Sequence, residues 1–165
     1  MVLADGEGFG AGAHVTTEMA LAEIFRLEHG TALDVGCGAG LLSLAWALLG
    51  KGRVRGIDVD TRAVAQARRS AHLNPGVEIE FAIAEIGRLR HDLDVDVLLA
   101  NLPRPGHDAL LGHDLRPRAL LVTGMGRRDT DEVCEAWRAR DLRTHAASRR
   151  GRWHLRVLKA EAAPE

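Results

Sequence analysis

The stretch Leu33-Asp34-Val35-Gly36-Cys37-Gly38-Ala39-Gly40 decides how the chain is interpreted, because an apolar run breaks there into three glycines at alternate positions. The run from Ala32 is typical of a buried strand, and residues 41–49 have the apolar spacing of a helix. Glycines permit tight turns and close backbone approach, and a helix start offers free N–H groups with partial positive charge. The stretch therefore predicts a strand, a ligand-binding turn and a helix N-terminus.

Length and composition place the chain among ordinary globular proteins. It has 165 residues, of which 46% are hydrophobic and 27% charged, and its net charge of −1 excludes a globally polycationic nucleic-acid binder. Two cysteines without a closely spaced framework indicate a reduced, cytoplasmic protein, and the scattered histidines indicate no metal site. No apolar run reaches about 18 residues, so we expect neither a membrane span nor a membrane partner.

Strand and helix patterns alternate along the chain. This order predicts an α/β fold with a doubly wound, mostly parallel seven-stranded sheet, helices on both faces and a C-terminal antiparallel hairpin. The expected strands are 32–35, 53–58, 77–84, 95–100, 119–123, 142–147 and 153–158, the last two flanking a turn at Arg149-Arg150-Gly151. The expected helices are one capped by Thr16 or Thr17, one at 41–49, one capped by Asp60, a short one within 103–114, and one with Asp129 and Glu132 as a capping box.

The hydrophobic patterns of the expected strands distinguish an edge strand from central strands. Residues 77–84 alternate, with Val77, Ile79, Phe81 and Ile83 on one face, which predicts an edge strand. Residues 95–100 and 119–123 are more nearly continuous apolar runs, which predicts central strands covered on both faces.

The glycine spacing and two acids indicate which kind of nucleotide the turn holds. A dinucleotide fingerprint requires G-x-G-x-x-G, whereas the glycines here are Gly36, Gly38 and Gly40. Asp34 precedes the turn, and Asp58 ends the second expected strand, where a carboxylate can accept both hydroxyls of a ribose. Because the pyrophosphate fingerprint is lacking, the predicted ligand is a nucleoside with an amino-acid tail.

The chain resembles a known family in these motifs. DVGCGAG at 34–40, followed by GIDVD at 56–60, is similar to the first two motifs of class I S-adenosylmethionine-dependent methyltransferases. Upstream, GFGAGAHVTT at 8–17 resembles the FGTGxHxTT loop of the PrmA family, whose members methylate a ribosomal large-subunit protein. The resemblance covers Gly8 to about Lys159. It implies a Rossmann-like methyltransferase fold, S-adenosyl-L-methionine as cofactor, and a single domain, 1–165, in which residues 1–16 form a loop that contacts the cofactor.

The resemblance also implies roles for individual residues. Asn101 is implied to lie beside the methyl donor, where its side chain and the Leu102 carbonyl would accept N–H bonds from an amine. Asp58 would hold the ribose, Glu85 would lie on the adenine side, and Asp34 would face the methionine ammonium. The implied cofactor-binding residues are Thr17, Asp34, Gly36, Gly38, Gly40, Asp58, Val59, Glu85 and Asn101, and the implied catalytic residues are Asn101 and Leu102.

Two departures from the family pattern concern the methyl acceptor. PrmA-type proteins have Asn-Ile-Leu after the fourth strand, whereas this chain has Asn101-Leu102-Pro103, and the chain is expected to lack the family's separate N-terminal recognition domain. The predicted acceptor is an amino group of a ribosomal protein. The alternatives are a methyltransferase of the same fold acting on a small molecule or RNA, and a non-catalytic S-adenosylmethionine-binding subunit.

Two further features allow a functional and a structural interpretation. The arginines at Arg149–Arg152 would suit RNA contact, but a charged edge hairpin that resists aggregation is the favoured interpretation. His14 is predicted either to contact a ligand or to form a hydrogen bond with the backbone.

Overall fold

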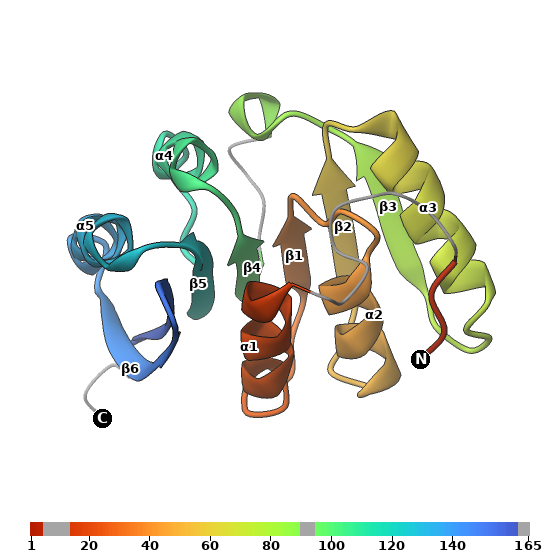
Figure 1. Ribbon diagram of the computed structural model, residues 1–165, viewed down its shortest axis with the longest axis horizontal. Coiled ribbons are helices and arrows are strands. Elements are labelled where there is room, and N and C mark those ends of the chain that lie inside the picture. The colour runs from red at the N-terminus through yellow and green to blue at the C-terminus, as the bar shows by residue number, and fades with distance from the viewer. Residues whose placement is uncertain (5–13, 90–94, 162–165) are drawn as a thin grey trace.

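The computed structural model describes residues 1–4, 14–89 and 95–161. These residues form a seven-stranded sheet in the order β3-β2-β1-β4-β5-β7-β6 (Figure 1), which is parallel except that β7 runs antiparallel to β5 and to β6. The predicted mostly parallel sheet with a C-terminal antiparallel hairpin is therefore confirmed. The strands are β1 (Ala32–Val35), β2 (Val54–Asp58), β3 (Ile79–Ile83), β4 (Val97–Asn101), β5 (Ala119–Met125), β6 (Leu142–Arg150) and β7 (Trp153–Ala160).

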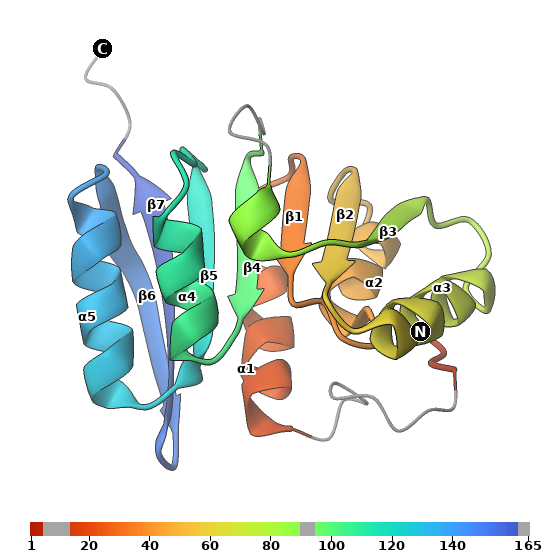
Figure 2. The ribbon, with the colours of Figure 1, turned by 90° about the horizontal axis from the view of Figure 1, so that it is seen from above.

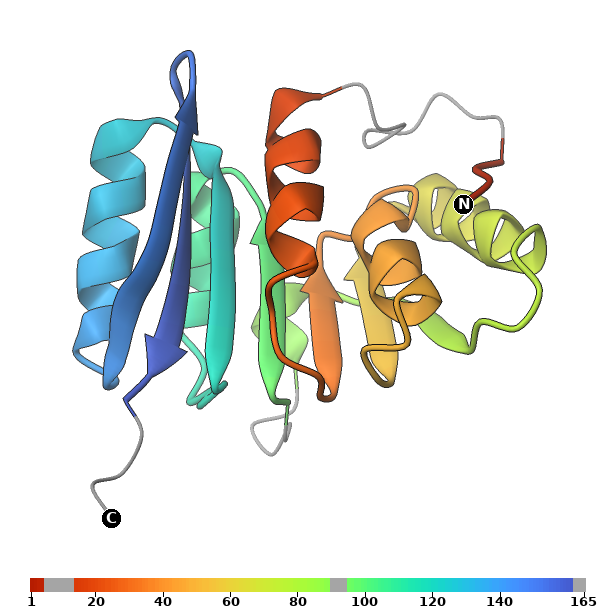
Figure 3. The same cartoon turned by 90° about the horizontal axis from the view of Figure 1, so that it is seen from below.

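Helices cover both faces of this sheet. α4 and α5 lie over one face (Figure 2), and α1 and α2 lie over the opposite face, with α3 packed at the β3 edge (Figure 3). Trp46 and Trp137 are each fully buried and belong to the apolar clusters on the two faces. The helices are α1 (Val15–Ile24), α2 (Leu41–Leu48), α3 (Thr61–His72), α4 (Arg104–Leu111), α5 (Arg127–Arg138) and the 3-10 helix η1 (Ile86–Arg88).

The burial of the strands follows their sequence patterns, with one exception. Residues 97–100 and 119–123 are all buried, because apolar side chains of β4 and β5 meet helices on both faces. β3 lies at the edge of the sheet, as the alternation predicts. Ile83, expected on its apolar face, is instead 55% exposed, whereas Phe81 packs against Val64 and Ala67 of α3. The apolar face of β3 therefore ends before the carboxyl edge.

The start of α1 differs from the sequence-based expectation. His14 is the N-cap, and its Nδ1 accepts the Thr16 N–H at 3.4 Å, so neither Thr16 nor Thr17 caps the helix. Both threonines are buried inside the first turn, where their side chains are not positioned to cap it. The cap of α3 is confirmed, since the Asp60 carboxylate accepts the Arg62 N–H at 2.8 Å.

Two assignments near the C-terminus are also wrong in position. α5 begins after Gly126, so Asp129 lies within its first turn and is not the cap. Asp129 and Glu132 instead pair with Arg104 of α4, because the packing of the two helices brings that guanidinium to them. In the hairpin, Arg150 pairs with Trp153, so a two-residue turn, Gly151-Arg152, replaces the expected Arg149-Arg150-Gly151.

Residues 1–4 form hydrogen bonds with α3 and with the turn that follows it. The Val2 N–H donates to Asn74 Oδ1 at 2.8 Å, and the Ala4 N–H donates to Ser70 Oγ at 3.1 Å. Val15 and Thr16 belong to α1, so the predicted loop 1–16 is wrong at its C-terminal end. Residues 5–13, which hold most of that loop motif, lie outside the described residues. Contact between this segment and a cofactor stays a prediction.

Within the described ranges, none of the helices combines the length and the apolar character that a membrane crossing requires.

Candidate functional site

A cleft of about 320 Å³ lies at the carboxyl ends of β1, β2, β3 and β4. Open α/β sheets bind ligands at this edge, in the crevice where neighbouring connections diverge to opposite faces. The volume falls within the range of small-molecule sites, roughly 300–1,000 Å³. The cleft is lined by Gly36, Gly38, Ile57, Asp58, Val59, Ala84, Ile86, Asn101, Leu102, Pro103 and Gly106.

The glycine turn after β1 forms one wall of this cleft. Gly36 has φ +67°, and a Cβ at this position would lie 2.3 Å from Leu102 Cδ2 across the cleft. Gly40 has φ +82° and begins α2, but a Cβ there would meet the Phe81 ring at 2.7 Å, away from the cleft. Gly36 and Gly38 therefore face the candidate ligand, whereas Gly40 permits close packing of α2 against β3.

Asp58 ends β2 and braces the glycine turn. Its Oδ2 accepts the Gly38 N–H at 2.9 Å, and its Oδ1 accepts the Asp60 N–H at 2.9 Å. A carboxylate has about four acceptor positions, so each oxygen can accept one further hydrogen bond. Asp58 is thus placed to receive two hydroxyl groups of a ligand lying in the cleft.

Asp34 lies behind the turn rather than on the cleft wall. Its side chain is buried, and its Oδ2 accepts the Ser43 N–H at 3.0 Å and the Ser43 hydroxyl at 2.6 Å. Asp34 therefore supplies the first turn of α2 with the side-chain cap that Gly40 cannot provide. Burial raises the pKa of Asp34 to about 6, and the two Ser43 hydrogen bonds oppose that rise. Its predicted contact with an ammonium group stays a prediction.

Asn101 is the last residue of β4, rather than the first residue after it as expected, and Leu102 follows it on the opposite wall of the cleft. Asn101 Nδ2 donates to Thr17 Oγ1 of α1 at 3.4 Å, which joins the end of β4 to the start of that helix. The Leu102 N–H donates to the Thr123 carbonyl of β5 at 3.1 Å. Thr17 is buried and does not line the cleft, so its place at the site is beneath Asn101.

A second hollow of about 640 Å³ continues from the cleft toward η1. It shares Val59 and Ala84 with the cleft and adds Ile83, Glu85 and Arg88. Val59 and Ile83 are 65% and 55% exposed, an unusual exposure for large apolar side chains at the ends of neighbouring strands. They offer an apolar platform for a flat ring, and Glu85 lies beside it, paired with Arg88 at 3.2 Å. Ile83 is not among the predicted site residues, although an apolar residue at the end of a strand was the available signal.

The hairpin turn lies at the same end of the molecule as the start of α1 (Figure 3). The His14 ring meets Trp153 edge-on, with centroids 5.0 Å apart, and its Nδ1 lies 2.7 Å from Thr16 Oγ1. The Arg152 guanidinium stacks over Trp153 at 4.6 Å. Arg150 pairs with Glu18 at 2.7 Å. These contacts favour the structural interpretation of His14, and RNA contact at Arg149–Arg152 stays untested.

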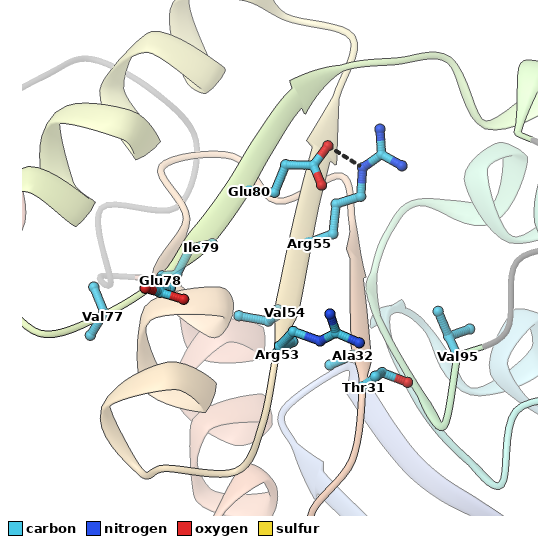
Figure 4. Close-up of a pocket in the computed structure, with 10 residues that line it drawn as sticks. All are labelled: Thr31, Ala32, Arg53, Val54, Arg55, Val77, Glu78, Ile79, Glu80 and Val95. Atoms are coloured by element: carbon cyan, nitrogen blue, oxygen red, sulfur yellow. Dashed lines mark ion pairs between the residues drawn. The ribbon is translucent and has the colours of Figure 1, made fainter.

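A larger hollow lies elsewhere, at the amino ends of β1, β2 and β3 (Figure 4). Its volume is about 710 Å³, and its charged side chains include Arg53, Arg55, Glu78 and Glu80. Arg55 Nε pairs with Glu80 across the strands at 3.1 Å. None of the described residues that line it is a glycine or lies in the first turn of a helix, so its size alone does not make it the candidate site. Among the described residues, no group of three or more His, Cys, Asp or Glu is placed to hold a metal ion.

The fold is that of solved methyltransferases. A crystal structure of a ribosomal protein L11 methylase from Lactobacillus delbrueckii subsp. bulgaricus superposes with a TM-score of 0.75 and 23% identity, covering 97% of this chain and 84% of that one. Magnesium protoporphyrin IX methyltransferase from Synechocystis PCC 6803, solved with bound SAM, gives a TM-score of 0.65 and 17% identity, with 86% of this chain and 75% of that chain covered.

Sequence similarity narrows the class to one family. The chain belongs to the family described as ribosomal protein L11 methyltransferase (PrmA), whose model matches residues 1–158. The ribosomal protein L11 methyltransferase of Dechloromonas aromatica (strain RCB) is 37% identical over 81% of this chain and 46% of its own length. That of Syntrophotalea carbinolica is 34% identical over 98% of this chain and 55% of its own length. The chain spans about half the length of these curated relatives.

Proposed function

We propose that the chain binds S-adenosyl-L-methionine in the carboxyl-edge cleft and transfers its methyl group to an amino group of a ribosomal protein. One observation carries the proposal: the glycine turn, Asp58 and Asn101 converge on a single cleft in a chain of the PrmA family. The single domain 1–165 and a cytoplasmic location are parts of the same proposal.

The residues of the cleft fit this cofactor. The remaining acceptor positions of Asp58 suit the two ribose hydroxyls, and the exposed side chains of Val59 and Ile83 suit the apolar faces of adenine. The glycine turn and the N-terminus of α2 suit the carboxylate of the methionine tail, because unpaired N–H groups and the helix dipole favour an anion. Glu85 would lie at the adenine edge, and Asp34, Thr17 and Gly40 would support these residues from behind.

Asn101 would orient the acceptor. Because its Nδ2 is directed to Thr17, its Oδ1 is available to accept an N–H of an amine and to aim the nitrogen lone pair into the cleft. The Leu102 carbonyl would accept the second N–H. When bound, the cofactor supplies an electrophilic methyl group, and transfer to a neutral nitrogen leaves S-adenosylhomocysteine and a proton. Orientation of two reactants is worth up to about 7–11 kcal/mol of the barrier, so positioning is the main contribution expected of these residues.

A transfer assay with three acceptors tests the proposal. The chain is incubated with methyl-labelled S-adenosylmethionine and, separately, purified ribosomal protein L11, ribosomal RNA and a metabolite extract, and the labelled product is identified by mass spectrometry. Label on amino groups of the ribosomal protein supports the proposal, and the Asn101→Ala variant should lose that label while retaining cofactor binding.

The other results of this assay separate the alternatives. Label on RNA or on a metabolite would replace the protein acceptor with one of these. Binding of the cofactor without transfer to any of the three would favour a non-catalytic binding subunit. Absence of cofactor binding would overturn the proposal altogether.

A further inference from the structure

Leu102 is enclosed by glycines from three different elements. A Cβ on Gly36 would lie 2.3 Å from Leu102 Cδ2, and one on Gly106 of α4 would lie 3.1 Å from Leu102 Cβ. On Gly124, at the end of β5, a Cβ would lie 2.4 Å from the Leu102 carbonyl oxygen. The approaches at Gly36 and Gly124 are closer than any larger residue would allow, and the approach at Gly106 is tight. The structure therefore fixes Leu102 more tightly than an ordinary turn residue.

The carbonyl of Thr123 connects this residue to α4. Its oxygen accepts the Leu102 N–H at 3.1 Å, and Nε2 of His107 lies 3.0 Å from the same oxygen. A carbonyl can only accept, so the Nε2 of His107 must carry the proton. One oxygen of β5 thus holds both the backbone of the candidate catalytic turn and the ring of a histidine outside the cleft lining.

Packing alone would favour an apolar side chain, and not a histidine, at position 107. The residue has no exposed surface, and its Nδ1 has no hydrogen-bond partner among the described residues. A buried polar atom without a partner is unfavourable, and a leucine would fill the same space without it. Burial also lowers the pKa of His107, which keeps the ring neutral at neutral pH. What the ring contributes beyond a leucine is its hydrogen bond to the Thr123 carbonyl, together with an electrostatic interaction with the Leu102 backbone.

We propose that His107 is a positioning residue for the turn Asn101-Leu102-Pro103, which it sets through the Thr123 carbonyl. His107 touches neither cofactor nor acceptor; it fixes the oxygen on which the Leu102 amide rests. The inference rests on the proposed function, because the turn is taken to orient the acceptor amine. Its geometric part, the coupling of His107 to the Leu102 amide, is independent of activity.

The test compares His107→Leu, His107→Gln and a control, His113→Leu. Glutamine places an amide N–H near the position of Nε2, whereas leucine removes the donor. His113 is also buried, but it lies just after the C-terminus of α4, at the end of the helix away from the turn 101–103. Amide hydrogen exchange measured by NMR reports the coupling, and isothermal titration with S-adenosylmethionine, together with kcat on the ribosomal protein, reports its consequence.

In His107→Leu we expect the Leu102 amide to exchange about tenfold faster, with amides 97–100 of β4 unchanged. We also expect kcat to fall about tenfold while the cofactor Kd stays within about twofold. His107→Gln should restore both values, and His113→Leu should lower only the melting temperature. Unchanged exchange at Leu102 in His107→Leu would overturn the inference even if the chain proved inactive. Wild-type protein that does not bind or transfer would instead contradict the proposed function, with the exchange result still deciding the coupling.

Discussion

The two hollows at opposite ends of the parallel strands differ in chemistry more than in size. The amino-end hollow is about twice as large, yet its principal contact is the ion pair between Arg55 and Glu80, whose side chains are 41% and 66% exposed. Exposed ion pairs contribute only about 0–1 kcal/mol to stability. The carboxyl-edge cleft combines a glycine turn in the left-handed region with the Asp58 carboxylate that supports it, and the buried acid Asp34 lies directly behind that turn. The comparison shows that local backbone geometry and unfilled acceptor positions, rather than volume, distinguish the candidate site.

The largest expected effect comes from Gly36→Ala. The new Cβ would lie 2.3 Å from Leu102 Cδ2 at φ +67°, so the turn must move or Leu102 must leave the cleft wall. We expect S-adenosylmethionine affinity to fall by about 100-fold or more, equal to about 3 kcal/mol. Isothermal titration measures it. Gly50→Ala is the matched control, because Gly50 has φ +63° with open space around it; unaltered binding in Gly36→Ala would contradict the account.

Asp34→Asn should change how stability depends on pH. The pKa of Asp34 is raised from 3.8 to about 6, so the folded state holds its proton more tightly than the unfolded chain. The contribution of Asp34 to stability is therefore complete below about pH 4 and is lost as the pH rises through 6, a decline of about 3 kcal/mol. Urea unfolding of both proteins between pH 4 and pH 8 measures this difference.

The variant lacks the titrating group, so its stability relative to wild type should rise with pH over that range. A difference that stays constant, or that changes in the opposite direction, would mean that Asp34 is not buried as the structure indicates.

Asp58→Ala should weaken cofactor binding by about 30-fold, because it removes a charged acceptor of two hydroxyl hydrogen bonds. Asp60→Ala is the control two residues away: it removes the cap of α3 and should lower stability by about 1 kcal/mol without affecting affinity. Equal losses of affinity in the two variants would show that the loop conformation, and not the Asp58 carboxylate, is responsible.

The smallest effect is expected in the amino-end hollow. Glu80→Gln removes the exposed pair with Arg55, so stability should change by less than about 1 kcal/mol and cofactor affinity by less than about twofold. Thermal unfolding and isothermal titration check both values. A large loss of affinity in this variant would reverse the roles assigned to the two regions.

The sequence predicted the succession of strands and helices and the mostly parallel sheet better than the ends of the elements. The buried strands β4 and β5 could be predicted because a continuous apolar run is visible within the segment itself. The caps depend on tertiary packing. His14 caps α1, and Asp129 and Glu132 form ion pairs with Arg104 instead of a capping box, because α4 packs against α5. The pattern of one segment does not predict which residue of a distant segment its side chains will contact.

The same distinction applies to the candidate site. Gly36, Gly38, Asp58 and Asn101 could be predicted because each has a motif position, and the structure brings all four to one cleft. Gly40 and Asp34 share the motif but serve packing and the cap of α2, and periodicity does not separate these roles. His107 escaped prediction because its importance lies in an oxygen of β5, sixteen residues further along the chain.

The most direct test of the central claim is an amide NMR titration of the labelled chain with S-adenosylmethionine. The account predicts saturable shifts at Gly36, Gly38, Asp58, Val59 and Asn101, with the amides of 53–55 and 78–80 unchanged. Shifts concentrated at 53–55 and 78–80, or no shift at about 1 mM ligand, would contradict it.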